Sequence, residues 1–396
     1  MASPPLGSAG SGSERVRLGE RGQAAASAAS IRQSNSERTR GLYRIVLAMR
    51  EPPSVPSLDA DPVIAHLDRG WELLDRGDLS GARRAAEAAA GHAPAAPELL
   101  TLQGAIAAAE GDTEAALERF RAAADADPDH PSPLLQSAEL HLYSLDDPEQ
   151  ARDLAEQALD LAEEPEERAD AALLLAECEL AADRDEQAAA ALAALDGLEH
   201  DDASLHLRAG QAWLDLSRLD EAERGFRAAL ACDPDLADAH HGLGLVLEAR
   251  GDTAGMRDAW LRARRLDLLA PRPPWHIDAD AFERIAEAAL AQLPEPVRAH
   301  LANVPILVCD YPSIEIVAEG NDPRMLGYFA GVPLGDKSHV GGDAPQPDCV
   351  FLYQRNIEAA CRSGDELERE IHITLWHETA HFFGLDDAQL ADMGLG

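Results

Sequence analysis

The sequence predicts an all-α solenoid of paired helices, followed by a small α/β (α+β) domain. Two observations carry this prediction. Between residues 61 and 270, small and bulky residues recur with a period of about 34 residues, which is typical of stacked helical repeats. Beyond residue 278, short β-branched apolar runs alternate with amphipathic helical segments, which indicates a separate domain of mixed secondary structure.

Six units of similar pattern make up the predicted solenoid. In the unit 97–130, Gly104, Phe120 and Pro128 stand at positions that the unit 203–236 repeats. The other units span 63–96, 131–165, 168–202 and 237–270, and the pattern is weakest in 131–165 and 168–202. Small residues let paired helices approach closely, bulky residues fill the space between them, and Pro ends the second helix.

This pattern resembles tetratricopeptide-repeat proteins. The resemblance implies about six repeats in residues 61–270, stacked into a right-handed superhelix whose concave face holds a peptide or the tail of a partner. We therefore expect the repeats to recruit a substrate or regulatory protein. A spacer or self-association module is the alternative, and the pattern leaves the oligomeric state open.

Charge and composition exclude several classes of partner. The 396-residue chain has 34 Lys plus Arg against 72 Asp plus Glu, a formal net charge of −38. Such a surface repels nucleic acid and anionic membranes and favours a basic protein partner, although acidic charge can also serve solubility alone. No apolar run reaches membrane-spanning length. Five scattered cysteines without a C-x-x-C pair indicate reduced thiols in a cytoplasmic protein.

Two segments fall outside the predicted domains. Residues 1–60 are rich in Ser, Gly, Ala and Arg, and no apolar core of the kind found in signal peptides follows the start. We expect this segment to be disordered. Residues 271–277 are rich in Pro and are expected to be a linker between the solenoid and the small domain of residues 278–396.

The small domain carries both helical and strand patterns. Residues 282–293 are amphipathic with helical spacing. The apolar, β-branched runs predict strands at 304–309, 314–318 and 349–353, and the Gly- and Pro-rich stretch 327–347 predicts a loop between the last two. Tyr353 and Arg355 are weak candidates for contacting a substrate carbonyl, since both residue types are more often packing or surface residues of strands.

The most informative segment is His377-Glu378-Thr379-Ala380-His381 near the end of the chain. Residues four apart share one face of a helix, so His377 and His381 can present two imidazoles to one metal ion. Glu378 then stands where a general base for water would be needed. A capping box beginning at Ser363 opens the predicted helix, and Gly384 ends it.

Two histidines leave a catalytic zinc one protein ligand short. Only fifteen residues follow His381, too few for another helix to bring in a distant glutamate. Asp387 completes the spacing H-E-x-x-H-x-x-G-x-x-D, and we favour it as the third ligand, with Asp386 as the alternative. Either aspartate could instead cap a short following helix.

The order of motifs from residue 278 onward resembles small bacterial zincin-like metallopeptidases, the minimal zincins. The matching stretches are Asp280–Glu283, Leu326–Leu334, Ser338–Gly342, Phe351–Glu358 and the histidine helix. The resemblance implies a compact zincin fold that binds one catalytic Zn²⁺ through His377, His381 and Asp387, with Glu378 as the general base. It carries over no physiological substrate.

The function predicted from these features is zinc-dependent hydrolysis of a peptide or protein substrate that the repeats help to recruit. The alternative from another class is a non-catalytic scaffold, in which the repeats bind a partner and the zincin fold is structural or regulatory. A purely structural zinc site is a third possibility, but it would need four protein ligands and no open position.

Overall fold

The computed structural model describes residues 62–195, 197–198, 200–301, 303–331 and 348–385. The chain divides into two compact units, with the boundary between Val246 and Leu247. Residues 1–60, which were predicted to be disordered, lie outside the described residues. None of the described helices combines the length and the apolarity that a bilayer-spanning helix needs.

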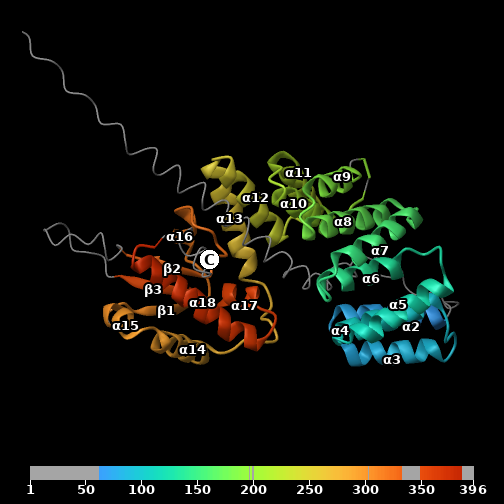
Figure 1. Cartoon of the computed structure of the whole chain (residues 1–396), viewed down its shortest axis with the longest axis horizontal. Coiled ribbons are helices and arrows are strands. Elements are labelled where there is room, and N and C mark those ends of the chain that lie inside the picture. Colours follow the sequence, from blue (N-terminus) through green and yellow to red (C-terminus); the bar gives the residue numbers. More distant parts are fainter. Residues whose placement is uncertain (1–61, 196, 199, 302, 332–347, 386–396) are drawn as a thin grey trace, which may run out of the picture. The chain divides into compact units, whose positions relative to one another are not determined.

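Helices account for the whole repeat region, as predicted (Figure 1). They are α2 (Pro62–Asp75), α3 (Leu79–Ala90), α4 (Pro97–Ala109), α5 (Thr113–Ala126), α6 (Ser132–Tyr143), α7 (Pro148–Leu161), α8 (Pro165–Ala181), α9 (Asp185–Ala193), α10 (Ala203–Asp215), α11 (Leu219–Cys232), α12 (Ala237–Ala249) and α13 (Thr253–Asp267). Each of the six sequence units therefore holds one helix pair. Within the repeat unit, the first helices of successive pairs, α2, α4, α6, α8 and α10, also pack against one another.

The turn inside each helix pair has the same backbone conformation. One residue per turn adopts a left-handed φ between 54° and 82°: Gly77, Gly111, Asp146, Asp183, Ser217 and Gly251. In four of the six turns the next residue is an aspartate whose side chain accepts a hydrogen bond from the first turn of the second helix: Asp78, Asp112, Asp147 and Asp252. Such a cap satisfies backbone N–H groups that a helix leaves free at its start.

Glycines in the first helices allow the close approach that the sequence predicted. A Cβ atom added at Gly104 would lie 2.5 Å from the ring of Phe120, and one added at Gly210 would lie 2.9 Å from the ring of Phe226. Phe120 and Phe226 are fully buried. The bulky residue of each pair thus fills the space that the missing side chain leaves.

The second unit contains a three-stranded sheet with helices packed on one face (Figure 1). Its elements are α14 (Ala279–Gln292), α15 (Glu295–Leu301), β1 (Ile306–Cys309), α16 (Ile314–Ala318), β2 (Gly327–Ala330), β3 (Cys349–Tyr353), α17 (Gln354–Ala360) and α18 (Gly364–Phe382). The strand order is β1-β3-β2, with β1 parallel and β2 antiparallel to β3. Val350 and Leu352 of β3 are buried in one core with residues of α14 and α18.

Two local predictions in this unit were wrong. Residues 314–318 form helix α16 instead of a strand, because Ser313 caps the segment: its hydroxyl accepts a hydrogen bond from Ile316 N at 3.3 Å. The stretch 327–347, predicted as a loop, begins with strand β2, in which Gly327 pairs with Leu352 of β3. The part of this stretch from 332 to 347 lies outside the described residues.

The segment 271–277 makes specific contacts with α17. The indole N–H of Trp275 donates to the carbonyl oxygen of Glu358 at 2.8 Å, and the side-chain amide of Gln354 donates to the carbonyl oxygen of Ile277 at 2.7 Å. His276 Nδ1 lies 2.8 Å from Glu358 Oε1. Side-chain contacts therefore fix this segment against the sheet-containing unit.

Helix α13 belongs to this unit as well. Arg264 Nε donates to the carbonyl oxygen of Pro312 at 2.8 Å, and the hydroxyl of Tyr311 donates to the carbonyl oxygen of Asp267 at 2.6 Å. Arg324 forms a two-bond pair with the Asp267 carboxylate at 2.9 and 3.0 Å. Paired Arg–carboxylate contacts of this kind hold their partners in one geometry.

Candidate metal centre

The local sequence explains why α18 forms and how it is oriented. Ser363 is its N-cap, and the hydroxyl accepts a hydrogen bond from Glu366 N at 3.2 Å, as the predicted capping box requires. Leu367, Ile371 and Leu375 are almost fully buried against the sheet. Gly384 ends the helix with φ +84°, a conformation that favours glycine. These predictions are confirmed.

The two histidines of α18 converge. Their Nε2 atoms lie 3.0 Å apart, and the two rings are nearly perpendicular at 80°. Two imidazole nitrogens bound tetrahedrally to one zinc ion would be roughly 3.3 Å apart. The separation of His377 Nε2 and His381 Nε2 therefore fits a shared ion to within a few tenths of an ångström.

A second hydrogen bond orients His381. Its Nδ1 atom lies 3.0 Å from the carbonyl oxygen of Leu385, one residue beyond Gly384. A metal-binding histidine commonly donates its other ring N–H to a carbonyl, which fixes the tautomer and leaves the second nitrogen for the metal. The turn at Gly384 brings the Leu385 carbonyl back to the helix and so supports this role.

Glu378 lies between the histidines in sequence and is only 7% exposed. Its side chain packs on strand β2: a Cβ atom added at Gly327 would lie 2.5 Å from Glu378 Cγ and 2.9 Å from Glu378 Oε1. A larger residue at this point of β2 would therefore displace the carboxylate. Gly327 lies in the stretch Leu326–Leu334, which resembles the zincin-like family. Its contact with Glu378 could not be predicted from the sequence, because the two residues are far apart in the chain.

The third predicted ligand cannot be placed from the structure. Asp387 and its alternative Asp386 both lie outside the described residues. Within the described ranges, no group of three or more His, Cys, Asp and Glu side chains gathers around a possible metal position. His377 and His381 are thus the two members of the predicted ligand set that the structure brings together.

Tyr353, the last residue of β3, and Arg355, which lies in helix α17 and not in a strand, differ in their surroundings. Tyr353 is 1% exposed, and its hydroxyl has no hydrogen-bond partner among the described residues. Burial raises the pKa of Tyr353 well above its usual range, and the charge of Glu378 adds to the shift. Arg355 instead donates to the carbonyl oxygens of Ala270 and Pro271 at 3.0 and 3.2 Å. Arg355 therefore holds the segment before α14.

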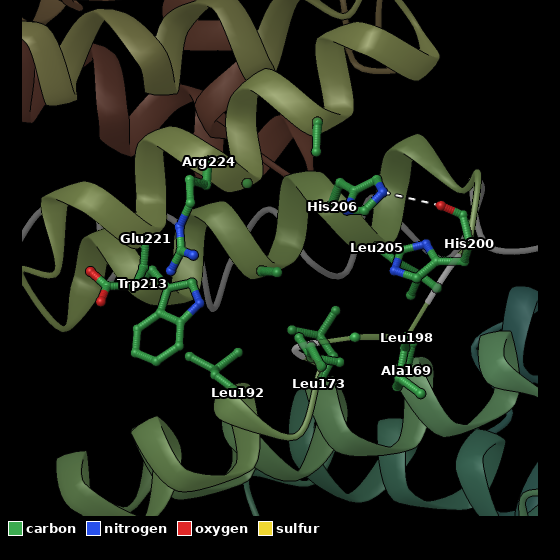
Figure 2. Close-up of a pocket in the computed structure, with 15 residues that line it drawn as sticks. Ala169, Leu173, Leu192, Leu198, His200, Leu205, His206, Trp213, Glu221 and Arg224 are labelled. Carbon is green, nitrogen blue, oxygen red and sulfur yellow. Dashed lines mark hydrogen bonds between the residues drawn. The ribbon is translucent and has the colours of Figure 1, made fainter.

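The repeat unit contains a separate cavity of about 190 Å³ between the pairs α8–α9 and α10–α11. Figure 2 shows its apolar wall of leucines and Trp213, with His200 and His206 at one end and Arg224 at the other. The two histidine rings stack 4.2 Å apart, and His206 Nε2 lies 3.2 Å from the carbonyl oxygen of His200. A concavity with leucines along one wall and polar groups at its ends has the mixed lining that binding pockets often show.

Helix α18 presents two histidines and an intervening glutamate beside an edge strand of the described sheet, and this arrangement supports a zincin-like assignment of the fold. Comparison with known families agrees with this assignment. The model of the zincin-like metallopeptidases matches residues 301–395, and a tetratricopeptide-repeat model matches residues 67–131. The chain therefore combines tetratricopeptide repeats with a zincin-like metallopeptidase domain.

Several solved structures are similar to part of the chain. Pseudomonas aeruginosa pilF is 18% identical over 52% of this chain and 91% of its own, with a TM-score of 0.43. The type IV pilus biogenesis factor PilW is 16% identical over 52% of this chain and 94% of its own, also with a TM-score of 0.43. YrrB, described as a TPR protein with an unusual peptide-binding site, is 18% identical over 46% of this chain and 91% of its own, with a TM-score of 0.34. No curated protein matches the chain.

Proposed function

We propose that the zincin-like domain hydrolyses peptide bonds with one zinc ion held by His377, His381 and Asp387, and that the repeats recruit a protein substrate or regulator. The observation that carries the catalytic half is the 3.0 Å approach of the two imidazole Nε2 atoms beside the buried Glu378. Five free cysteines also support a reducing, cytoplasmic location.

Zinc, when bound there, supplies a Lewis acid for a peptide carbonyl and increases the acidity of water. Glu378 is the proton carrier: a carboxylate oxygen accepts a proton from the attacking water and later returns it to the leaving amine. Its packing against Gly327 restricts the carboxylate to one side of the helix, which prepares it for this role.

Strand β2 is the proposed place for the substrate backbone. It is an edge strand in the described sheet, because only its β3 side is paired. A peptide can add to such an edge through main-chain hydrogen bonds. Because Gly327 of β2 packs on Glu378, a peptide lying along this strand would bring its backbone close to the proton carrier.

The repeat half of the proposal rests on the matched tetratricopeptide repeats and on the cavity of Figure 2. Stacked helical repeats present an extended surface that commonly binds protein segments. The cavity is large enough for one apolar side chain, since an engineered cavity of about 150 Å³ accommodates benzene.

Metal analysis of the full chain, paired with a Glu378→Gln variant, tests the catalytic half. We expect about one zinc per chain in both proteins and hydrolysis of a peptide library by the native protein alone. A native protein without zinc would refute the site. Zinc in both proteins with equal, background hydrolysis would favour the non-catalytic scaffold.

The third ligand needs its own comparison. Asp387→Ala should weaken zinc binding far more than Asp386→Ala, because loss of one of three protein ligands lowers affinity directly. Competition with a fluorescent zinc chelator measures both affinities. Equal losses in the two variants would contradict the choice of Asp387.

A further inference from the structure

The first helices of three successive repeats share a buried group of charged side chains. Arg208 of α10 is 3% exposed, and its guanidinium bonds both oxygens of Glu177 at 2.7 and 3.0 Å and Asp170 Oδ1 at 2.9 Å. Glu177 and Asp170 are on α8. The hydroxyl of Tyr143, on α6, also donates to Glu177. One cation thus serves two carboxylates that are each about one-sixth exposed.

A third carboxylate in this group has no such partner. Glu139 of α6 is 7% exposed, and it lies within electrostatic range of Asp170, Arg208 and Glu177. Its carboxyl makes no hydrogen bond within the described residues. One turn earlier on the same helix face, the side-chain carbonyl oxygen of Gln136 is buried and also lacks a donor. In the described part of the chain, Gln136 Oε1 is therefore a buried acceptor without a donor, and the Glu139 carboxyl next to it lacks a protein partner.

Buried acceptors without donors are costly, and so is an excess of negative charge away from water. If all three carboxyls were ionised, the group would carry two more negative charges than Arg208 offsets. Burial and the neighbouring Asp170 raise the pKa of Glu139 to about 8, and burial also raises the pKa of Asp170. A cationic donor at Glu139 would remove both costs together.

We propose that this face of α6, α8 and α10 binds a lysine side chain of the recruited partner, with Glu139 as the acceptor of its ammonium group. An ammonium carries three N–H donors and one positive charge, which match the acceptors Glu139 and Gln136. An anionic side chain would meet only acceptors and negative charge. The inference deepens the recruitment half of the proposed function and does not depend on the metal centre.

A peptide array tests the proposal with the full chain. The probes are random twelve-residue peptides with one central lysine, and the same peptides with that lysine acetylated. The chain should prefer the lysine set by about tenfold or more, because acetylation removes the charge and two of the donors. Glu139→Gln should abolish the preference, whereas Glu118→Gln, which removes an exposed charge on α5, should keep it.

Calorimetry gives a second readout. Burial and the charge of Asp170 raise the pKa of the Glu139 carboxyl, so capture of an ammonium near pH 7 should release a fraction of a proton, seen as a binding enthalpy that changes between phosphate and Tris buffers. Glu139→Gln should bind without proton release. Circular dichroism verifies that each variant is folded.

The outcomes separate this inference from the broader proposal. Equal binding of lysine and acetyl-lysine peptides, or a preference that survives in Glu139→Gln, would overturn the lysine site while leaving recruitment intact. Absence of binding to either peptide set would contradict both. Failure of hydrolysis would concern the metal centre alone.

Discussion

Gly327 of strand β2 and Glu378 of helix α18 are packed too closely for a side chain at residue 327. Glu378 is the proton carrier of the proposed site. A Cβ atom at Gly327 would lie 2.5 Å from Glu378 Cγ, a separation that real structures essentially do not show. Gly327→Ala should therefore turn the Glu378 side chain away. We expect a loss of peptide hydrolysis of at least about tenfold in kcat, since a misplaced catalytic group of this kind can cost a hundredfold.

The matched control for this prediction is Gly364→Ala. Nothing lies within 4 Å of a Cβ atom at Gly364, which is the first residue of α18. This variant should keep native kcat, and both variants should bind one zinc. Loss of zinc from Gly327→Ala, or unchanged hydrolysis, would show that the contact does not position Glu378.

Gly384→Ala should weaken zinc binding through His381. The left-handed φ of +84° at Gly384 directs the Leu385 carbonyl to His381 Nδ1, and a Cβ atom in that conformation costs about 1–2 kcal/mol. Loss of a hydrogen bond to the outer nitrogen of a metal-binding histidine typically lowers affinity by about 10- to 100-fold. Chelator competition measures the change.

A variant with the same backbone penalty distinguishes strain from loss of that hydrogen bond. Gly111, in the turn between α4 and α5, has φ +82° and open space around its Cβ position. Gly111→Ala should destabilise the chain by a similar amount while leaving zinc affinity native. If both variants bound zinc equally well, the Leu385 carbonyl would have no role at the site.

The elements that the sequence predicted correctly are those whose signals are local. The limits of α18 follow from Ser363 and Gly384, each of which acts on the residues next to it. The repeats follow from a regular period, and the loop inside each of the six helix pairs has the same backbone conformation. The strand predicted at 314–318 was wrong because a five-residue β-branched run is compatible with either a strand or a helix. The cap at Ser313 decided the outcome.

What the sequence missed depends on pairs of residues far apart in the chain. Strand β2 is only four residues long and exists through its pairing with β3. The need for glycine at position 327 arises only when β2 packs against α18, because a side chain there would clash with Glu378. The charged group around Arg208 likewise joins three repeats, and each member looks like an ordinary surface residue in its own helix.

The buried Glu139 should make stability depend on pH. Its pKa rises from an ordinary 4.5 to about 8 in the folded chain, because of burial and the charges of Asp170 and Glu177, with Arg208 opposing. The folded state therefore holds this proton where the unfolded state has lost it, so stability falls as pH rises from about 4.5 to about 8. In Glu139→Gln this contribution should vanish.

Urea unfolding at pH 5 and pH 8, followed by circular dichroism, measures the effect. As pH rises, the free energy of unfolding of Glu139→Gln should increase relative to that of the native protein, by at most about 1.4 kcal/mol per pH unit. Glu118→Gln, at an exposed position of α5, should follow the native pH profile. Parallel profiles for all three proteins would mean that Glu139 titrates near its ordinary pKa in the folded chain.

The segment 271–277 should contribute stability to the sheet-containing unit instead of acting as a free tether. Glu358 is fully buried, and its Oε1 atom accepts from Gln354 at 2.7 Å and lies 2.8 Å from His276 Nδ1. Its Oε2 atom has no partner among the described residues. His276→Ala would leave this carboxyl with one hydrogen bond, at a cost of about 2–3 kcal/mol.

Arg298→Ala is the comparison, because it removes an exposed pair with Glu295, worth at most about 1 kcal/mol, and an exposed hydrogen bond to the carbonyl oxygen of Ala291. Denaturation followed by tryptophan fluorescence reports on this unit once Trp71 and Trp213 of the repeat unit are replaced by Phe in every protein compared, since Trp275 packs against the core of the sheet-containing unit. If His276→Ala cost no more than Arg298→Ala, the segment would be a passive linker. A further substitution, Glu358→Gln, should recover part of the loss in His276→Ala, because a neutral amide at this buried position no longer needs a cation or a second donor.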